Sequence, residues 1–295
     1  MAQATPLSRY VRIQRTVDKE LAVVLRDAAN EAEKIILRLA GKEGRGAALR
    51  RAQMQAQLKQ LRKLQAELWG SVSKATNLGM QRAAEGAAEA EIAINKVLFE
   101  AAGVRHESFD AAMRIQAQEA VQNVISRGAN GIPLSRQVYY SRALAQKQVD
   151  KAINRALLLN FSAKELADVV KSLILPTTPG GVSYAAMRLA RTEINNAFHR
   201  TQIDLRKGDP WTEGFKWHLS GSHPRPDECN DYADRSHYRG GDPGVFKTGD
   251  VPGKPHPQCL CFITTVTIGT EDFIDKMARG DFDSFMEKKL ADFGA

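Results

Sequence analysis

The chain has 295 residues, of which 43% are hydrophobic and 26% charged. These values allow a sizeable buried core and exclude wholesale disorder. No run approaches the roughly 18 uncharged apolar residues of a membrane-spanning helix, and three cysteines are too few for a disulfide framework. We therefore expect a soluble protein of a reducing compartment.

The net charge of +8 is unevenly distributed along the chain. Residues 1–160 hold 25 Lys and Arg against 15 Asp and Glu, whereas residues 161–295 hold 17 against 19. A basic half of this kind is typical of contact with a polyanion or with an acidic protein surface. The alternative is a set of solvated helix faces, because the basic residues alternate with acids.

The first 175 residues predict a helical assembly. Nine of the eleven prolines lie between Pro176 and Pro257, so the N-terminal half is nearly free of helix breakers. Apolar residues recur there at spacings of three and four, which is typical of buried helix stripes. The predicted features are a helix with Leu21, Leu25, Ala28, Ala32, Ile35 and Leu39, a glycine break at 41–46, a helix with Leu58, Leu61, Leu64 and Leu68, helices at 92–99 and 109–125, a loop at 127–133, a helix from the N-cap Ser135 towards Leu159, and a helix capped by Ser162 and Glu165.

The remaining residues predict shorter elements of mixed type. The segment PTTPGG (176–181) is typical of a linker. We then expect a helix over 183–207, a strand over 215–219, a loop over 220–257 and a strand over 261–268. Two short amphipathic helices should follow, docked on a partner or on the same chain.

Together these elements predict a mainly α fold with a small α+β C-terminal domain. Its helical and basic N-terminal assembly would comprise residues 1–175. Residues 176–268 would form a core in which a loop-rich Cys/His knot lies between short strands. Residues 269–295 would be an amphipathic tail.

All three cysteines and three of the six histidines lie in the two segments 217–229 and 256–261. Cysteine and histidine in a Pro/Gly-rich loop between short strands are typical of a tetrahedral zinc site, in which metal bonds replace a hydrophobic core. The predicted ligands are four of a set of five residues, His223, Cys229, His256, Cys259 and Cys261. The alternative is a metal-free fold with small buried thiols and loop-fixing histidines.

No catalytic residues are predicted, because catalytic templates fit this region poorly. Zinc deaminases need H-x-E with P-C-x-x-C, which the sequence lacks. A phosphate-binding glycine loop is absent, since PTTPGG is not followed by G-K-[ST]. Four aspartates near the cysteines could bind a hard cation, but without EF-hand spacing: Asp227, Asp231, Asp234 and Asp242.

Three segments, taken in order, resemble the phage head morphogenesis family, the phage Mu F-like minor head proteins. They are LARTEINNAFHRTQ (189–202), KWHLSGSHPRPDEC (216–229) and VPGKPHPQCLCFITTV (251–266), with DPGVF between the last two. The resemblance covers roughly residues 135 to 268. This chain has Cys-Asn-Asp-Tyr where many members have Cys-Pro-x-Cys, and Leu260 where an Arg is common.

The resemblance implies a structural minor head protein of a tailed phage and not an enzyme. Such a protein is associated with the portal vertex of the virion, after assembly in the host cytoplasm, and acts in prohead assembly, DNA packaging or genome ejection. Its partners would be the portal protein and other capsid proteins, with non-specific contact with packaged double-stranded DNA and none with a membrane. The alternative is a metal-dependent enzyme that acts on nucleic acid.

Overall fold

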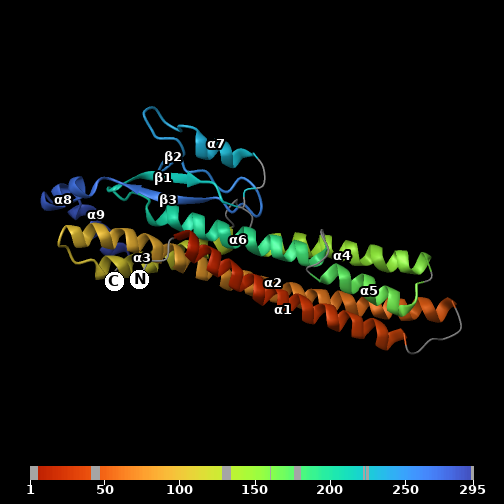
Figure 1. Ribbon diagram of the computed structural model, residues 1–295. Coiled ribbons are helices and arrows are strands. Elements are labelled where there is room, and N and C mark those ends of the chain that lie inside the picture. Colours follow the sequence, from red (N-terminus) through yellow and green to blue (C-terminus); the bar gives the residue numbers. More distant parts are fainter. Residues whose placement is uncertain are drawn as a thin grey trace. The chain divides into compact units, whose positions relative to one another are not determined.

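The computed structural model describes residues 6–40, 47–127, 134–159, 161–175, 181–221, 223 and 226–293. In this part of the chain helices dominate, and three short strands form one antiparallel sheet (Figure 1). The elements are α1 (Pro6–Ala40), α2 (Ala47–Ala101), α3 (Glu107–Arg127), α4 (Leu134–Leu158), α5 (Ala163–Ile174), α6 (Val182–Leu205), β1 (Thr212–His218), α7 (Glu228–Asp234), β2 (Val245–Lys247), β3 (Phe262–Thr267), α8 (Thr270–Ala278) and α9 (Asp283–Phe293). The predicted fold class, mainly α with a small α+β part, is confirmed.

The chain forms two compact units, each assembled from segments that are distant in sequence. Unit 1 consists of Met1–Gln14, Gly79–Gly131 and Thr192–Ala295, and unit 2 consists of Arg15–Leu78 and Ile132–Arg191. Three helices, α1, α2 and α6, contribute residues to both units. The predicted glycine break at 41–46 and most of the predicted loop 127–133 and linker 176–181 lie outside the described residues, as does the side chain of Ser135.

Unit 2 is a helical assembly built around the predicted stripe of α1. Leu21, Leu25 and Ala32 of this stripe are buried. The predicted capping box of α5 is present, because the Ser162 hydroxyl accepts the N–H of Glu165 while the Glu165 carboxylate accepts the N–H of Ser162. Three ion pairs join helices of this unit: Arg191–Asp18 at 3.0 Å, Lys171–Glu33 at 2.5 Å and Arg62–Asp150 at 3.3 Å.

The two helices predicted around Leu58–Leu68 and Ile92–Phe99 are one continuous helix, α2, so that prediction was wrong. No proline interrupts this stretch, and isolated glycines are tolerated inside helices. Gly86 has a packing role in unit 1, because a Cβ at this position would lie 2.8 Å from Ile13 Cδ1.

The sheet of unit 1 has the strand order β2-β1-β3, and both pairs are antiparallel. The strands predicted over 215–219 and 261–268 are confirmed as β1 and β3. The stretch 220–257, predicted as a loop, contains α7 and β2 in addition. Alternation places Phe215 and Trp217 of β1 on one buried face, and Figure 1 shows α7 and the C-terminal part of α6 alongside the sheet.

The C-terminal helices α8 and α9 dock on their own chain, within unit 1. Trp211 is fully buried and makes edge-to-face contacts with Phe99, Phe273, Phe282 and Phe285, at ring-centroid distances of 5.3 to 5.6 Å. Such aromatic pairs add stabilisation beyond their buried area. The amphipathic pattern of the tail is therefore explained by packing inside unit 1.

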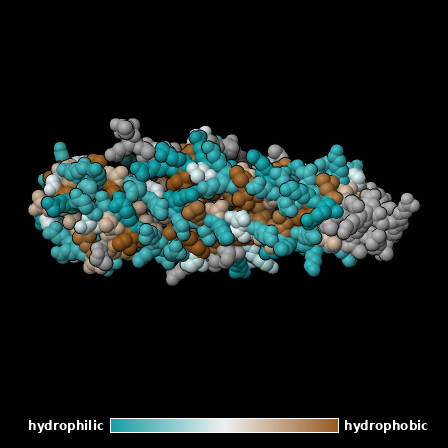
Figure 2. Space-filling view, turned by 90° about the horizontal axis from the view of Figure 1, so that it is seen from below, coloured by the Kyte–Doolittle hydropathy of each residue, from teal (hydrophilic) through white to brown (hydrophobic). Residues whose placement is uncertain are grey.

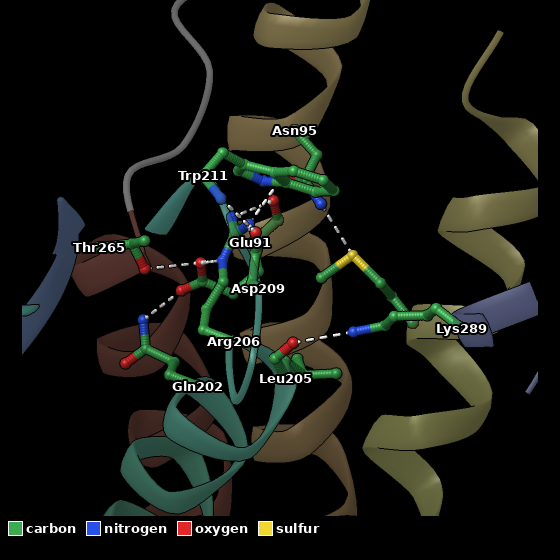
Figure 3. A network of polar contacts seen from close by, with 10 residues as sticks. Glu91, Asn95, Gln202, Leu205, Arg206, Asp209, Trp211, Thr265 and Lys289 are labelled. Carbon is green, nitrogen blue, oxygen red and sulfur yellow. Dashed lines mark hydrogen bonds and ion pairs between the residues drawn. The ribbon is translucent and has the colours of Figure 1, made fainter. Parts of the chain in front are cut away.

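A network of polar side chains lies in the interior of unit 1 around the guanidinium of Arg206 (Figure 3). Arg206 donates to the Glu91 carboxylate at 2.8 Å, to Asn95 Oδ1 at 2.5 Å and to Asp209 Oδ2 at 2.8 Å. Glu91 also accepts hydrogen bonds from Gln202 at 2.9 Å and from Thr265 at 2.7 Å. The network thus joins α2, α6 and β3.

A second buried cation lies at the edge of this network, on the tail helix α9. Lys289 Nζ donates to the Leu205 carbonyl at 2.9 Å and lies 5.4 Å from the centroid of the Phe109 ring. Burial lowers the pKa of Lys289 to about 8. The lysine therefore ties α9 to the C-terminal end of α6.

None of the described helices is long and apolar enough to cross a lipid bilayer. The face drawn in Figure 2 is largely hydrophilic, with hydrophobic residues in small groups between the polar ones.

Replacement of Arg206 by Met is expected to lower the free energy of unfolding by about 3–5 kcal/mol, because it leaves the Glu91 and Asp209 carboxylates buried without their cation. The matched control is Arg200→Met in α6, the helix that ends just before Arg206. The largely exposed ion pair of Arg200 with Asp204 contributes about 0–1 kcal/mol. Urea denaturation followed by circular dichroism measures both. Equal losses in the two variants would show that the buried network is not a main source of stability.

Candidate metal centre

The Cys/His cluster is formed by two short segments of unit 1. Cys229 lies in the first turn of α7, whose N-cap Asp227 accepts the Cys229 N–H at 2.8 Å. His256, Cys259 and Cys261 lie in the loop between β2 and β3. The Cys259 N–H donates to the His256 carbonyl at 3.3 Å, which closes a turn, so the ligand candidates are not on an extended strand.

Helix α6 holds this loop in place. The N–H of Gln258, which has a left-handed φ of 59°, donates to the Thr192 hydroxyl at 3.1 Å. The side-chain amide of Asn195 donates to the carbonyl of Cys259. Thr192 and Asn195 therefore position the backbone on both sides of the turn that carries His256 and Cys259.

Lys254, a residue of the same loop, contacts both the loop backbone and the sheet. Its ammonium group donates to the Cys261 carbonyl and lies 4.9 Å from the centroid of the Trp217 ring, while burial lowers the pKa of Lys254 to about 8. His199 contacts the same indole and bonds the Pro252 carbonyl at 2.9 Å through Nε2. Trp217 is thus enclosed by side chains that also fix the loop.

Three of the five predicted ligands converge on one point. Cys229 Sγ lies 3.5 Å from Cys259 Sγ and 3.7 Å from His256 Nε2. One ligand atom of each of the three residues lies within 4.8 Å of the others. Both thiols are buried, whereas 38% of the His256 side chain is exposed. This cluster of Cys229, His256 and Cys259 could hold a metal ion.

The other two predicted ligands lie beside this group and contact each other. Cys261 Sγ is 3.8 Å from His223 Nδ1, and the second nitrogen of His223 is 2.9 Å from Asn230 Oδ1. A contact with the Cys259 thiol lowers the pKa of Cys261 to about 5, and the same contact raises the pKa of Cys259. Burial raises the pKa of Cys229 to about 12.

Asp227 is a member of the site that the sequence did not predict as a ligand for zinc. Its carboxylate lies 3.1 Å from His256 Nε2 and 3.5 Å from His223 Nε2. Burial by itself raises the pKa of Asp227, but the Cys229 N–H and the two imidazoles outweigh burial, so the net shift is downward. The spacing Asp-x-Cys was a usable signal, because an aspartate two residues before a cysteine at a helix start is well placed to cap that helix.

The arrangement places sulfur, carboxylate and imidazole groups side by side. The thiol of Cys261, whose pKa is lowered, and the carboxylate of Asp227 lie next to two further thiols and an imidazole. Thiolate and imidazole are the ligand types that zinc and other borderline-soft metals prefer.

Apart from Leu189, Ala190 and Arg191, which belong to unit 2, the residues of the three segments that carry the family resemblance lie in unit 1. Thr192 of the A-R-T-E segment contacts the loop that holds His256 and Cys259, and Cys229 contacts that loop from the other side. A comparison of the chain with models of protein families, with curated proteins and with solved structures finds no match. The resemblance therefore rests on these residues.

Replacement of Thr192 by Val should lower the free energy of unfolding by about 1–3 kcal/mol, because the Gln258 N–H loses its acceptor while the side-chain shape is kept. The control is Thr201→Val on the same helix. The Thr201 hydroxyl is buried and has no hydrogen-bond partner among the described residues, so its removal should be neutral or stabilising. Thermal unfolding compares the two, and equal effects would exclude a positioning role for Thr192.

Proposed function

We propose that this chain is a structural minor head protein of a tailed phage, associated with the portal vertex, and that its Cys/His cluster is a structural zinc centre. The observation that carries the proposal is that Thr192 contacts the loop in which His256 and Cys259 meet Cys229. These residues belong to the three segments that resemble the minor head family, and up to 67 positions separate them in the chain.

The distances in the cluster support zinc. Zinc–sulfur bonds of about 2.3 Å in a tetrahedron separate two sulfur ligands by about 3.7 Å. The separations of Cys229 Sγ from Cys259 Sγ and from His256 Nε2, 3.5 and 3.7 Å, are close to this value. Cys261, which contacts the Cys259 thiol, is the best fourth ligand, and His223 is the substitute.

Burial favours a structural role of the metal over a catalytic one. The three cysteines are all within the packed interior beneath the sheet, together with Phe215, Trp217 and other apolar residues. A metal whose four ligands all come from the protein has no open position for a substrate or water. Zinc would instead fasten α7 to the loop before β3, and its binding energy would be folding energy.

Purified chain should contain about one zinc per molecule, since a four-ligand thiolate site binds this metal tightly. Cys229→Ser and Cys259→Ser should each remove most of the zinc and lower the melting temperature, and Cys261→Ser tests the fourth ligand. Elemental analysis and thermal unfolding, with and without a chelator, provide the readouts.

The matched control is Ile263→Val, a buried neighbour in the same cluster. It should cost about 1 kcal/mol through the lost methylene and leave the zinc content unchanged. Wild-type chain with only traces of zinc and a melting temperature that ignores chelator would favour the metal-free fold of buried thiols.

The role in the virion is tested on particles of the phage that encodes the chain. Mass spectrometry of purified heads should find the chain in few copies, and heads disrupted gently should release it together with the portal. Its absence from purified heads would contradict the proposed function. Cleavage of nucleic acid by the purified chain with added divalent metal, lost in the Cys259→Ser variant, would favour the enzyme instead.

A further inference from the structure

The two compact units differ strongly in charge. Unit 2 contains 22 Lys and Arg against 10 Asp and Glu, a net charge of +12, whereas unit 1 contains 20 against 24, a net charge of −4. The positive charge of the chain is therefore a property of unit 2, the helical assembly, and not of its N-terminal half as such. A net charge of this size favours association with acidic partners.

Large apolar side chains are exposed on one side of α4, in unit 2. Tyr139, Tyr140 and Leu144 are exposed by 66%, 53% and 58%. The opposite side of α4 is buried in unit 2 through Ala145 and Val149. An exposed group of aromatic and aliphatic residues on a helix whose other side is packed is typical of an interaction site.

The same side of α4 carries cations at helical spacing. Following Tyr140 and Leu144 at steps of three and four residues, Lys147, Lys151 and Arg155 are all exposed, and Arg136 lies one turn before Tyr140. We call these residues, together with Tyr139, the α4 outer face.

Acidic charge is missing from the α4 outer face. The sole carboxylate of α4, Asp150, is directed to its own unit, where it bonds Arg62 at 3.3 Å and Gln146 at 2.8 Å. Every charged residue of the α4 outer face is therefore a cation, and a partner seated on it needs acidic groups.

Part of the α4 outer face is already ordered for binding. Arg136 Nε donates to the Tyr140 hydroxyl at 3.2 Å, its guanidinium lies 5.7 Å from the centroid of the Tyr140 ring, and the Tyr139 ring packs edge-on against Tyr140 at 6.0 Å. Side chains held in this way lose less conformational freedom on association. Tyrosine and arginine are also the residues that dominate binding energy in protein interfaces.

We propose that the α4 outer face is a docking surface for a partner protein whose own surface is acidic and carries an apolar strip. A phosphate backbone would use the cations but would leave two tyrosines and a leucine in water, so duplex DNA explains only half of the surface. The inference rests on the proposed function, under which the portal protein is the partner.

The experiment measures binding of the full chain to the purified portal protein of the same phage, and separately to random-sequence duplex DNA. Tyr140→Ser combined with Leu144→Ser should weaken portal binding at least tenfold, since residues of an interface centre carry most of the affinity. Lys147→Gln combined with Lys151→Gln should weaken binding and reduce its salt dependence. The control is Val23→Ser in α1 of the same unit, 54% exposed, which should bind as the wild type does.

Each result has a distinct meaning. Portal binding that is unchanged in both α4 variants overturns the docking surface and leaves the proposed function intact. Weakened DNA binding with unchanged portal binding assigns the α4 outer face to nucleic acid instead. A wild-type chain that is present in purified heads but does not bind portal overturns the docking proposal alone, whereas absence from heads overturns the proposed function as well.

Discussion

Unit 1 depends on a charge that is buried in its interior and must be neutralised there. The Arg206 guanidinium is excluded from water, and a charge in that position is stable only with close counter-charges and a full set of hydrogen bonds. Glu91 and Asp209 provide the charges, and Asn95 accepts a further bond. Because Glu91 and Asn95 lie on α2, whereas Arg206 and Asp209 lie in the turn that follows α6, α2 and this turn have one arrangement that satisfies all of these contacts.

The candidate metal centre is linked to the Arg206 network through α6. The helix that ends next to Arg206 also presents Thr192 and Asn195, which hold the loop of His256 and Cys259. Trp211, two residues after Asp209, lies at the centre of the aromatic core against which α8 and α9 pack. Small domains use metals where apolar burial is insufficient, and here the aromatic core and the Cys/His cluster lie in different parts of unit 1.

Unit 2 uses a different set of forces. Its helices bury apolar stripes against one another and are joined by partly exposed ion pairs, which contribute little stability each. The Lys and Arg side chains that outnumber the acids of unit 2 repel one another, and this repulsion raises the free energy of the folded unit. An acidic partner on the proposed docking surface, the α4 outer face, would relieve this repulsion.

The sequence alone determined what depends on neighbours along the chain. Helical periodicity, the Ser162–Glu165 cap and the alternation in β1 follow from contacts over a few residues, and the five Cys and His candidates follow from composition. Only the tertiary structure decided which of the five Cys and His candidates lie together and that α2 is continuous. It also decided that Glu91 contacts Arg206, 115 positions away in the chain. In the sequence, Glu91 and Arg206 look like ordinary surface charges. The desolvation cost that requires each buried charge to have a partner arises only when folding removes the water around it.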